Sequence, residues 1–594
     1  MNKFKKLIQL TKNKFQNTSS CLKDTQNDIL SEATLKKDDL MFVTVVGLWI
    51  LTILYFNPRL LILMIGPESF IAKISVILFI ICLDIFWFYA IFHMTILTFS
   101  YFLKERTQQL KPIQKQHPPV ALLYVTYNDF RADAVLSCIN QDYDNSHAFI
   151  LDDSTDSKYI NNIDKFAGKY AKKVTVIRRE KREAFKAGNI NHALKLIAVQ
   201  YDYFAISDSD SILPPDFISK LLPYFSINKK IGFVQAMNKI NPDQKSYLAK
   251  AMGFNLELHY KRYILPREKY GFVMFHGHGA LIRTNVWQEV DGFPEIVSED
   301  LGFSTRMRKN GYTGVLAENC VCYEDYPPTY RHYRRRTEKW VKGTLEFLFK
   351  EYPSFFRTKS ISWFEKLDVM VSGLSLSLGF PFLLFLLLGS LALPIYFSNF
   401  RSYGPVFISA IPEGKTTVSL LTGLRYNVYW TRDFYLIMLI TIFYPLIPVL
   451  VDLVKKPAKM LMYMSISTYL FLSTLIWITV QTLSYLISRK VDFLVTAHEG
   501  AAEKTSKSNL WRQIISLKKE YLLVLAVEFI SAFIFIALMI RSNNLWLISV
   551  SIALFLSPFL LFFDFKSRIM RCLLSVPFIV SLFVLLLISN SIVK

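Results

Sequence analysis

The stretch YDYFAISDSD, residues 201–210, is a hydrophobic run that ends in two aspartates, Asp208 and Asp210. Its length and its aromatic and aliphatic composition predict a β-strand. The two carboxylates follow directly where the strand ends. In open α/β sheets, ligands bind beyond the carboxyl ends of the strands. The stretch therefore predicts both the kind of sheet and the edge of that sheet where a site lies.

Runs of the same kind lie on both sides of this stretch, and a helical pattern separates two of them. The expected elements are strands VALLYVTYN at 120–128, HAFILDDS at 147–154, KVTVIRR at 173–179 and GFVQA at 232–236, and a helix over 185–200. Strands that alternate with helices predict an α/β domain with a mainly parallel sheet. Acids also end the second strand, at Asp152 and Asp153. We therefore expect a nucleotide site at this edge.

The rest of the chain is too apolar for an ordinary soluble enzyme. Of its 594 residues 52% are hydrophobic, and the mean hydropathy is +0.28. The apolar residues concentrate before residue 104 and after residue 369, which indicates a membrane protein with one large polar domain. The net charge of +22 fits positive cytoplasmic loops and anionic lipid or phosphate partners. Nucleic acid is the rival partner, but no helix-turn-helix, finger or RNP pattern is present, so none is expected.

Charge and hydropathy together predict the order of the domains. They are a basic cytoplasmic leader (1–39), two transmembrane helices (40–104), the polar α/β domain (114–350), interfacial helices (351–369), two transmembrane helices (370–454) with an outside loop (397–433), an in-plane or re-entrant helix (460–487), a cytoplasmic loop (488–519) and three transmembrane helices (520–594). This order places the polar domain in the cytoplasm, beneath an inner or plasma membrane. The lipid bilayer is therefore an expected partner.

The segment 460–487 carries no charged residue, so hydropathy alone predicts an ordinary span. Lysines precede it at 455, 456 and 459, and Arg489 and Lys490 follow it. Positive charge on both sides favours two cytoplasmic ends. An in-plane or re-entrant helix is therefore the preferred interpretation, and the ordinary span stays open.

Several groups at the predicted sheet edge suit a phosphate-bearing ligand. Asp208 and Asp210 are hard oxygen ligands that can share one divalent cation, Mg²⁺ or Mn²⁺, with a diphosphate. Lys186 lies at a glycine-containing helix start, KAGN, from which it can reach phosphate oxygens. A lone Asp-x-Asp pattern is weak evidence. Its place beside the strand ends TYND and LDDS strengthens it.

The motif order resembles that of the processive membrane glycosyltransferases of family 2, which include bacterial cellulose synthase, hyaluronan synthase and chitin synthase. The motifs are TYND (126–129), LDDS (151–154), KAGNIN (186–191), DSD (208–210), SED (298–300) and RTEKW (336–340). The resemblance covers about residues 118–345, and LDDSTD is also similar to plant glucomannan synthases. Farther on, FLVTAHEG (493–500) is similar to the gating loop FxVTxK of cellulose synthases.

The resemblance implies a role for each matching residue. The implied catalytic residues are Asp300, as the base, and Glu299; the implied donor-site residues are Tyr127, Asp129, Asp153, Lys186, Asp208, Asp210, Arg336 and Lys339, with the metal on Asp208 and Asp210; the implied acceptor residues are Trp340 and His278; and the implied gating-loop residues are Phe493, Val495, Thr496 and His498. The fold implied is a GT-A-like domain inserted in an all-α transmembrane domain with interfacial helices.

Two departures from the family pattern bear on the site. Lys339 stands where the family has arginine, and it lacks the bidentate fork of arginine. Arg335 or Arg336 is an alternative ligand for the diphosphate. His498 stands where cellulose synthases have lysine, so the phosphate contact there is expected to be weaker and sensitive to pH. These changes put the identity of the polymer in doubt, not the reaction class.

Alternatives stay open at two further places. His276 and His278 could form a metal pair, although a turn beside the acceptor, with His278 bonded to sugar, is preferred. The cations at Arg331 and at 334–336 could form a lipid-facing basic patch instead of a phosphate site.

The preferred function is a processive inverting synthase. It would use a nucleotide-sugar donor, preferably UDP-glucose, to extend a growing β-linked polysaccharide and pass it through its own membrane channel. A non-processive family 2 enzyme that adds one sugar to a lipid or small acceptor is the alternative. A non-enzymatic transporter or receptor is disfavoured by the intact acidic constellation. No cyclic-dinucleotide-binding domain is expected.

Overall fold

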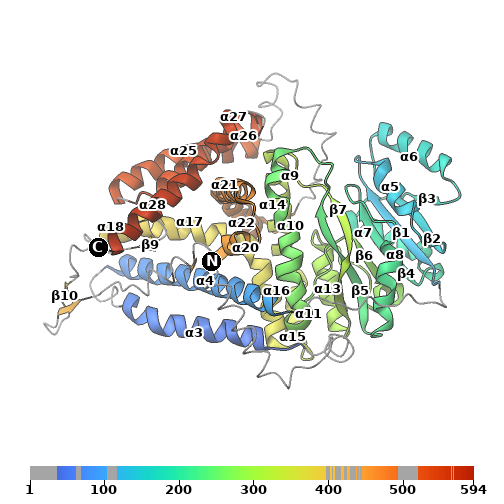
Figure 1. Cartoon of the computed structure of the whole chain (residues 1–594), viewed down its shortest axis with the longest axis horizontal. Coiled ribbons are helices and arrows are strands. Elements are labelled where there is room, and N and C mark those ends of the chain that lie inside the picture. Colours follow the sequence, from blue (N-terminus) through green and yellow to red (C-terminus); the bar gives the residue numbers. More distant parts are fainter. Residues whose placement is uncertain are drawn as a thin grey trace.

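The computed structural model describes residues 37–61, 69–103, 117–396, 444–491 and 519–593, apart from 543, 564, 566 and 567, together with short pieces between 402 and 441. A sheet domain lies on one side of the molecule and a helical part on the other (Figure 1). The helix α14, Tyr330–Lys350, stands between them. The leader 1–36, most of the predicted outside loop and the motif FLVTAHEG lie outside the described residues.

The sheet has seven strands in the order β3-β2-β1-β4-β6-β5-β7. Their bounds are β1 Val120–Thr126, β2 Ser146–Asp152, β3 Val174–Ile177, β4 Tyr203–Asp208, β5 Ile231–Ile240, β6 Ala280–Arg283 and β7 Thr313–Glu324. Only β6 pairs antiparallel with its neighbours, β4 and β5. The prediction of a mainly parallel α/β sheet is therefore confirmed, and the antiparallel strand was not foreseen.

Helices cover both faces of the sheet, which explains why its central strands are continuously apolar. Along β1, the alternate residues Val120, Leu122 and Tyr124 share one core with α5 (Ala132–Ile139) and α8 (Phe217–Leu221). The residues between them, Ala121 and Leu123, share the other core with α7 (Phe185–Ile197) and α12 (Thr284–Glu289). Two-sided burial fixes the register of β1, because a slip of one residue would exchange the two faces.

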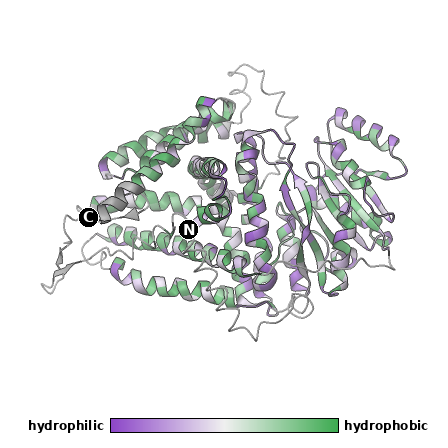
Figure 2. Ribbon diagram, in the orientation of Figure 1, coloured by the Kyte–Doolittle hydropathy of each residue, from purple (hydrophilic) through white to green (hydrophobic). Residues whose placement is uncertain are grey.

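Among the described residues, three helices are long and apolar enough to cross a membrane: α3 (Leu40–Leu61), α4 (Phe70–Phe102) and residues Tyr521–Ser542 of α25 (Lys519–Ser542). Two bent pairs could each form one more span. They are Trp363–Ser377 with Gly379–Ile395, bent by 60°, and α21 (Pro457–Ser473) with α22 (Leu475–Ser488), bent by 44°. Figure 2 shows hydrophobic residues along these helices and more polar ones over the sheet domain. The bend at 474 is compatible with a broken span and with a re-entrant loop. The prediction of an in-plane or re-entrant helix over 460–487 therefore stays open.

Further helices belong to the described chain. On the sheet domain they are α6 (Ser157–Lys169), α9 (Tyr247–Met252), α10 (Phe254–Leu258), a π-helical turn (His259–Ile264), α11 (Leu265–Tyr270) and α13 (Glu299–Lys309); toward the helical part they are α15 (Tyr352–Arg357), α16 (Trp363–Leu374), α17 (Gly379–Leu387), α20 (Ile447–Asp452), α26 (Leu547–Phe563), α27 (Arg568–Leu573) and α28 (Val576–Val593). Two buried bidentate ion pairs, Arg267–Asp368 and Arg308–Glu365, join α11 and α13 to α16. The predicted interfacial segment is therefore attached to the sheet domain.

Candidate active site

The carboxyl ends of β1, β2 and β4 meet at one edge of the sheet. Thr126 lies opposite Asp152, and Val125 lies opposite Asp208. Asp129 joins the loops beyond these ends. Its carboxylate accepts hydrogen bonds from the Thr126 hydroxyl (2.7 Å) and, at its other oxygen, from the Ser209 hydroxyl (2.7 Å). Asp129 was predicted to contact the donor, and in the structure it holds the Asp-Ser-Asp loop against the end of β1.

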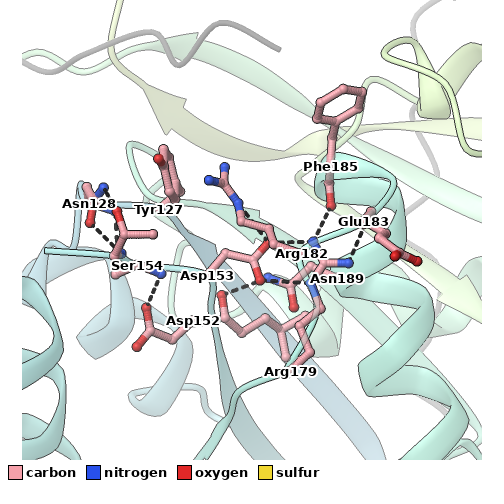
Figure 3. A network of polar contacts seen from close by, with 12 residues as sticks. Tyr127, Asn128, Asp152, Asp153, Ser154, Arg179, Arg182, Glu183, Phe185 and Asn189 are labelled. Atoms are coloured by element: carbon pink, nitrogen blue, oxygen red, sulfur yellow. Dashed lines mark hydrogen bonds and ion pairs between the residues drawn. The ribbon is translucent and has the colours of Figure 1, made fainter. Parts of the chain in front are cut away.

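Asp153 is paired with an arginine that the sequence analysis did not single out. Arg179 donates from Nε to Asp153 Oδ1 (2.9 Å) and from Nη2 to Oδ2 (2.7 Å), and both side chains are nearly buried. The same guanidinium donates to the carbonyls of Glu183 and Phe185 (Figure 3). Arg179 therefore connects the end of β2 to the loop that precedes α7.

That loop explains the glycine of the KAGN motif. Ala184 and Phe185 adopt left-handed backbone conformations, with φ of 54° and 49°, which is uncommon for residues other than glycine. The turn brings the chain onto the first turn of α7. A Cβ at Gly188 would lie 2.2 Å from the Glu183 oxygen and 2.6 Å from Arg179 Nη1. Only glycine fits at position 188, and the tight turn directs Lys186 toward β4.

Lys186 is the central cation of the site. Its ammonium lies 2.6 Å from Asp208 Oδ1 and 3.6 Å from Glu299 Oε1, and it donates to the carbonyl of Gly277 (3.0 Å). Burial alone would lower the pKa of Lys186, but the carboxylates of Asp208 and Glu299 hold it above its usual value. Lys186 is therefore charged, and it joins the Asp-Ser-Asp loop to the start of α13.

Asp300 faces this cation from the first turn of α13. A Cβ at Gly277 would lie 3.4 Å from Asp300 Oδ2 and 3.5 Å from Lys186 Nζ, and Gly277 has φ of +84°. Burial first, and the neighbouring charge of Glu299 second, raise the pKa of Asp300 to about 7. The positive charge of Lys339, on α14, acts on both Asp300 and Asp208. Asp300 is thus a carboxyl group poised to exchange a proton near neutral pH.

His278 adds a second cation beside Asp208. Its Nε2 lies 2.9 Å from Glu324 Oε2, and its Nδ1 lies 3.1 Å from the Ser211 hydroxyl. Burial opposes protonation of His278, but Glu324 outweighs it and raises the pKa to about 9. His278 was predicted to bind the acceptor, and here both of its ring nitrogens have partners inside the protein. In His276, by contrast, neither ring nitrogen has a hydrogen-bond partner among the described residues.

The basic side chains on α14 have different partners. The Arg336 guanidinium lies 4.2 Å from the ring centroid of Tyr326 and 4.6 Å from that of Trp340. Arg334 points to the opposite side, where it pairs with Glu528 of α25. Lys339 is the member whose charge acts on Asp208. Of the candidates for the diphosphate, Lys339 is therefore the best placed, and the half-exposed Trp340 stacks on Arg336.

The carboxylates fit a divalent cation that shares its coordination with a ligand. No group of three or more His, Cys, Asp or Glu side chains that could hold a metal is found where the chain is described. Asp208 already holds an ammonium at one oxygen, so this position accommodates a positive charge. Mg²⁺ and similar ions commonly take one or two carboxylates and complete their shell with substrate phosphates and water. Asp208 and Asp210 are the two carboxylates that would supply such an arrangement. The predicted gating-loop residues lie outside the described part of the chain.

Replacing Glu299 with glutamine is expected to move the pH dependence of the reaction. If Asp300 is the base, kcat/KM rises with pH through the pKa of about 7, because only the ionised carboxylate accepts a proton. Removal of the Glu299 charge removes one cause that raises this pKa, so the rising limb shifts to lower pH. The measurement is kcat/KM between pH 5 and 9, with the exposed Glu295→Gln as the control. If Glu299→Gln lowered the rate but left the rising limb of the pH profile at the same pH, the electrostatic coupling of Glu299 to Asp300 would be contradicted.

Comparison with known proteins identifies the domain. Residues 118–343 match the family described as "Glycosyltransferase like family 2". The probable glucomannan 4-beta-mannosyltransferase 11 of Arabidopsis thaliana is 24% identical over 229 residues, which are 38% of this chain and 52% of that protein. The probable glucomannan 4-beta-mannosyltransferase 4 of Oryza sativa subsp. japonica is 25% identical over 232 residues, 38% of this chain and 42% of that protein. The chain spans about half or less of the length of these relatives.

Two solved structures show a limited likeness. The mannosyltransferase PcManGT from Pyrobaculum calidifontis, in complex with GDP-Man and Mn²⁺, has a TM-score of 0.41 and 17% identity over 54% of this chain and 86% of its own. Residues 1–349 of S. aureus TarS have a TM-score of 0.31 and 15% identity over 44% of this chain and 72% of that chain. From the family match, the chain carries a family 2 glycosyltransferase domain, homologous to the plant glucomannan mannosyltransferases. This agrees with the predicted enzyme class.

Proposed function

We propose that the protein is a processive inverting glycosyltransferase that polymerises a nucleotide-activated hexose into a β-linked polysaccharide. The single observation that carries this proposal is Asp300, a carboxyl group of pKa about 7 that faces the Lys186–Asp208 pair across Gly277. A base and a cation cluster that both lie beside one small residue suit attack at a sugar carbon with departure of a diphosphate. The names of the relatives, which specify 4-β-mannosyl transfer, favour mannose over the glucose expected from the motifs.

The residues divide the work of transfer between them. Asp300 takes the proton of the acceptor hydroxyl as that oxygen attacks the anomeric carbon from the face opposite the leaving group, which inverts the configuration. The charge that develops on the diphosphate is neutralised by the cations Lys186, His278 and Lys339. Mg²⁺ or Mn²⁺ on Asp208 and Asp210 would supply further neutralisation of that charge. Asp153 and Tyr127 would hold the nucleoside. Asp129 would hold the Asp-Ser-Asp loop against the end of β1.

The product is proposed to leave through the membrane helices. Helix α14 carries Lys339 and Trp340, and it contacts α22, α25 and α26 through Arg334. The half-exposed indole of Trp340 offers an aromatic face on which a pyranose can rest and slide. The helices described above would place the protein in an inner or plasma membrane, with the sheet domain in the cytoplasm.

A donor panel tests this function. Purified protein in nanodiscs is incubated with labelled GDP-mannose, GDP-glucose, UDP-glucose and UDP-N-acetylglucosamine in the presence of MnCl₂ or MgCl₂, and the product length is measured. A long polymer that a β-specific endoglycosidase degrades is the expected result. A product with a single added sugar would support the non-processive alternative. Absence of both transfer and hydrolysis for every donor would overturn the proposal.

Replacing Asp208 with asparagine is expected to lower turnover by about two orders of magnitude, the loss typical when one group that stabilises developing charge is removed. The concentration of Mn²⁺ needed for half-maximal rate should also rise, because an amide is a weaker ligand than a carboxylate. Initial rates across a Mn²⁺ titration measure both effects. Asp216→Asn, whose side chain is 41% exposed and pairs with Lys220, is the control away from the site. An unchanged Mn²⁺ requirement would remove Asp208 from the metal site.

A further inference from the structure

The side chain of Arg182 covers the two groups that would recognise a nucleobase. Its guanidinium carbon lies 3.4 Å from the centroid of the Tyr127 ring, and its Nε lies 3.8 Å from Asp153 Oδ2. Figure 3 shows the arginine beside the tyrosine and the aspartate at the edge of the sheet. The side chain is 35% exposed, whereas that of Asp153 is 8% exposed. An aromatic face and a carboxylate that could accept a ring N–H are thus both capped by one surface residue.

The fold does not depend on this cap. Asp153 already receives two short hydrogen bonds from Arg179, so its charge is neutralised without Arg182. The loop before α7 is likewise held by Arg179, through the carbonyls of Glu183 and Phe185. The Nε of Arg182 lies beyond hydrogen-bond distance from Asp153. Arg182 can therefore leave the Tyr127 ring without unfolding the loop.

We propose that Arg182 binds the donor's nucleobase. When the nucleotide enters, the guanidinium moves off the Tyr127 ring, the base stacks on that ring, and the guanidinium stacks on the outer face of the base. The base is then held between the phenol ring and the guanidinium, with Asp153 at its edge. This inference rests on the proposed function, because it requires a nucleotide donor. A guanidinium is planar and weakly hydrated, so it stacks on flat π-systems as an ammonium does not. Its present position on a tyrosine ring shows that the geometry of such stacking is within its reach.

Stacking also predicts a preference among bases. A purine offers a larger face than a pyrimidine, so the guanidinium contributes more to the binding of GDP than of UDP. Loss of one stacking partner on a base costs an amount that corresponds to about tenfold in affinity. Arg182 is thus a specificity-determining residue, and the ratio of the two affinities reports its action independently of turnover.

The test is calorimetric titration of full-length protein in nanodiscs, with MnCl₂, by GDP, UDP and pyrophosphate. Arg182→Ala is expected to weaken GDP binding about tenfold, UDP binding less, and pyrophosphate binding not at all. Arg182→Lys should behave like Arg182→Ala, because lysine keeps the charge but loses the plane. Lys181→Ala, an exposed cation on the same loop, is the matched control and should bind as the wild type does.

The outcomes separate this inference from the proposed function. Equal or tighter GDP binding by Arg182→Ala would mean that the arginine only occupies the site, and the inference would be overturned. Full recovery of affinity in Arg182→Lys, or a loss of pyrophosphate binding in Arg182→Ala, would assign the residue to the diphosphate and overturn it equally. If wild-type protein bound neither GDP nor UDP, the proposed function itself would fail.

Discussion

Replacing Asp300 with asparagine is expected to abolish sugar transfer while nucleotide binding persists. The amide has the same shape and can still accept the hydrogen bond that the Leu301 N–H donates to Oδ1 (2.8 Å). It cannot accept the proton of the acceptor hydroxyl. A positioned general base contributes typically 10²–10⁴-fold to a rate, so turnover should fall by at least that range. Incorporation of labelled sugar measures the loss, and titration with GDP measures the retained donor site.

The same substitution should leave the protein at least as stable as the wild type. The pKa of Asp300 is raised from 3.8 to about 7 in the folded protein, so the unfolded chain releases this proton more readily than the folded one. Ionisation of Asp300 therefore lowers the free energy of unfolding as pH rises from 3.8 to about 7, and the whole loss is present above about pH 7. Asparagine removes that cost. Thermal unfolding at pH 8 checks this point, with Asp291→Asn as the control. Normal polymer synthesis by Asp300→Asn would exclude it as the base.

Much of the sheet domain could be predicted from the sequence, because its strands are locally marked. The apolar run at 203–208 is buried on both faces and ends in an acid, which indicates both the strand and its functional end. At the carboxyl ends of β1, β2 and β3 the expected bounds exceeded the observed ones by two residues, because turn residues continue the pattern there. The antiparallel β6 was not predicted, although it is as long as β3, which was.

The partners of the charged side chains could not be predicted, because they are distant in sequence. Arg179 and Asp153 are 26 positions apart, and Arg334 and Glu528 are 194 apart. A basic run such as RRRTEKW indicates cations near phosphate, but not which cation faces it. The helical repeat decides that: residues four apart, such as Arg336 and Trp340, lie on one face, and Arg334 lies on another. The contact of His278 with Glu324 could not be predicted for a similar reason, since Glu324 comes from β7.

Helix α14 therefore presents one face to the sheet domain and another to the apolar helices of the helical part. Arg334 is fully buried, and it donates from Nη1 and Nη2 to the two carboxylate oxygens of Glu528 (2.9 and 2.8 Å), which is also fully buried. Tyr330, one turn earlier, bonds to the hydroxyls of Ser473 and Ser557. These contacts tie the helix that carries Lys339 and Trp340 to α21, α25 and α26.

Replacing Glu528 alone with methionine is expected to destabilise this joint severely, because it leaves a buried guanidinium without its counter-charge. Removal of one partner of a buried ion pair typically costs about 3–5 kcal/mol. Arg334→Met alone should cost a similar amount, because it leaves the buried Glu528 carboxylate without its counter-charge. The double variant Arg334→Met/Glu528→Met should recover most of the loss, because hydrophobic side chains of similar volume can replace such a pair. Thermal unfolding in nanodiscs of the four proteins gives the coupling free energy.

The polymer assay on the same four proteins separates stability from positioning. If the ion pair only holds the fold together, the double variant regains both stability and normal turnover. If the pair also sets where α14 places Lys339 and Trp340, the double variant regains stability but keeps a raised KM for the acceptor and makes shorter products. The second result is expected, since methionine packing cannot reproduce the bidentate geometry that fixes the helix at Ser557 and Glu528. Single variants as stable as the wild type would show that the pair does not stabilise the fold.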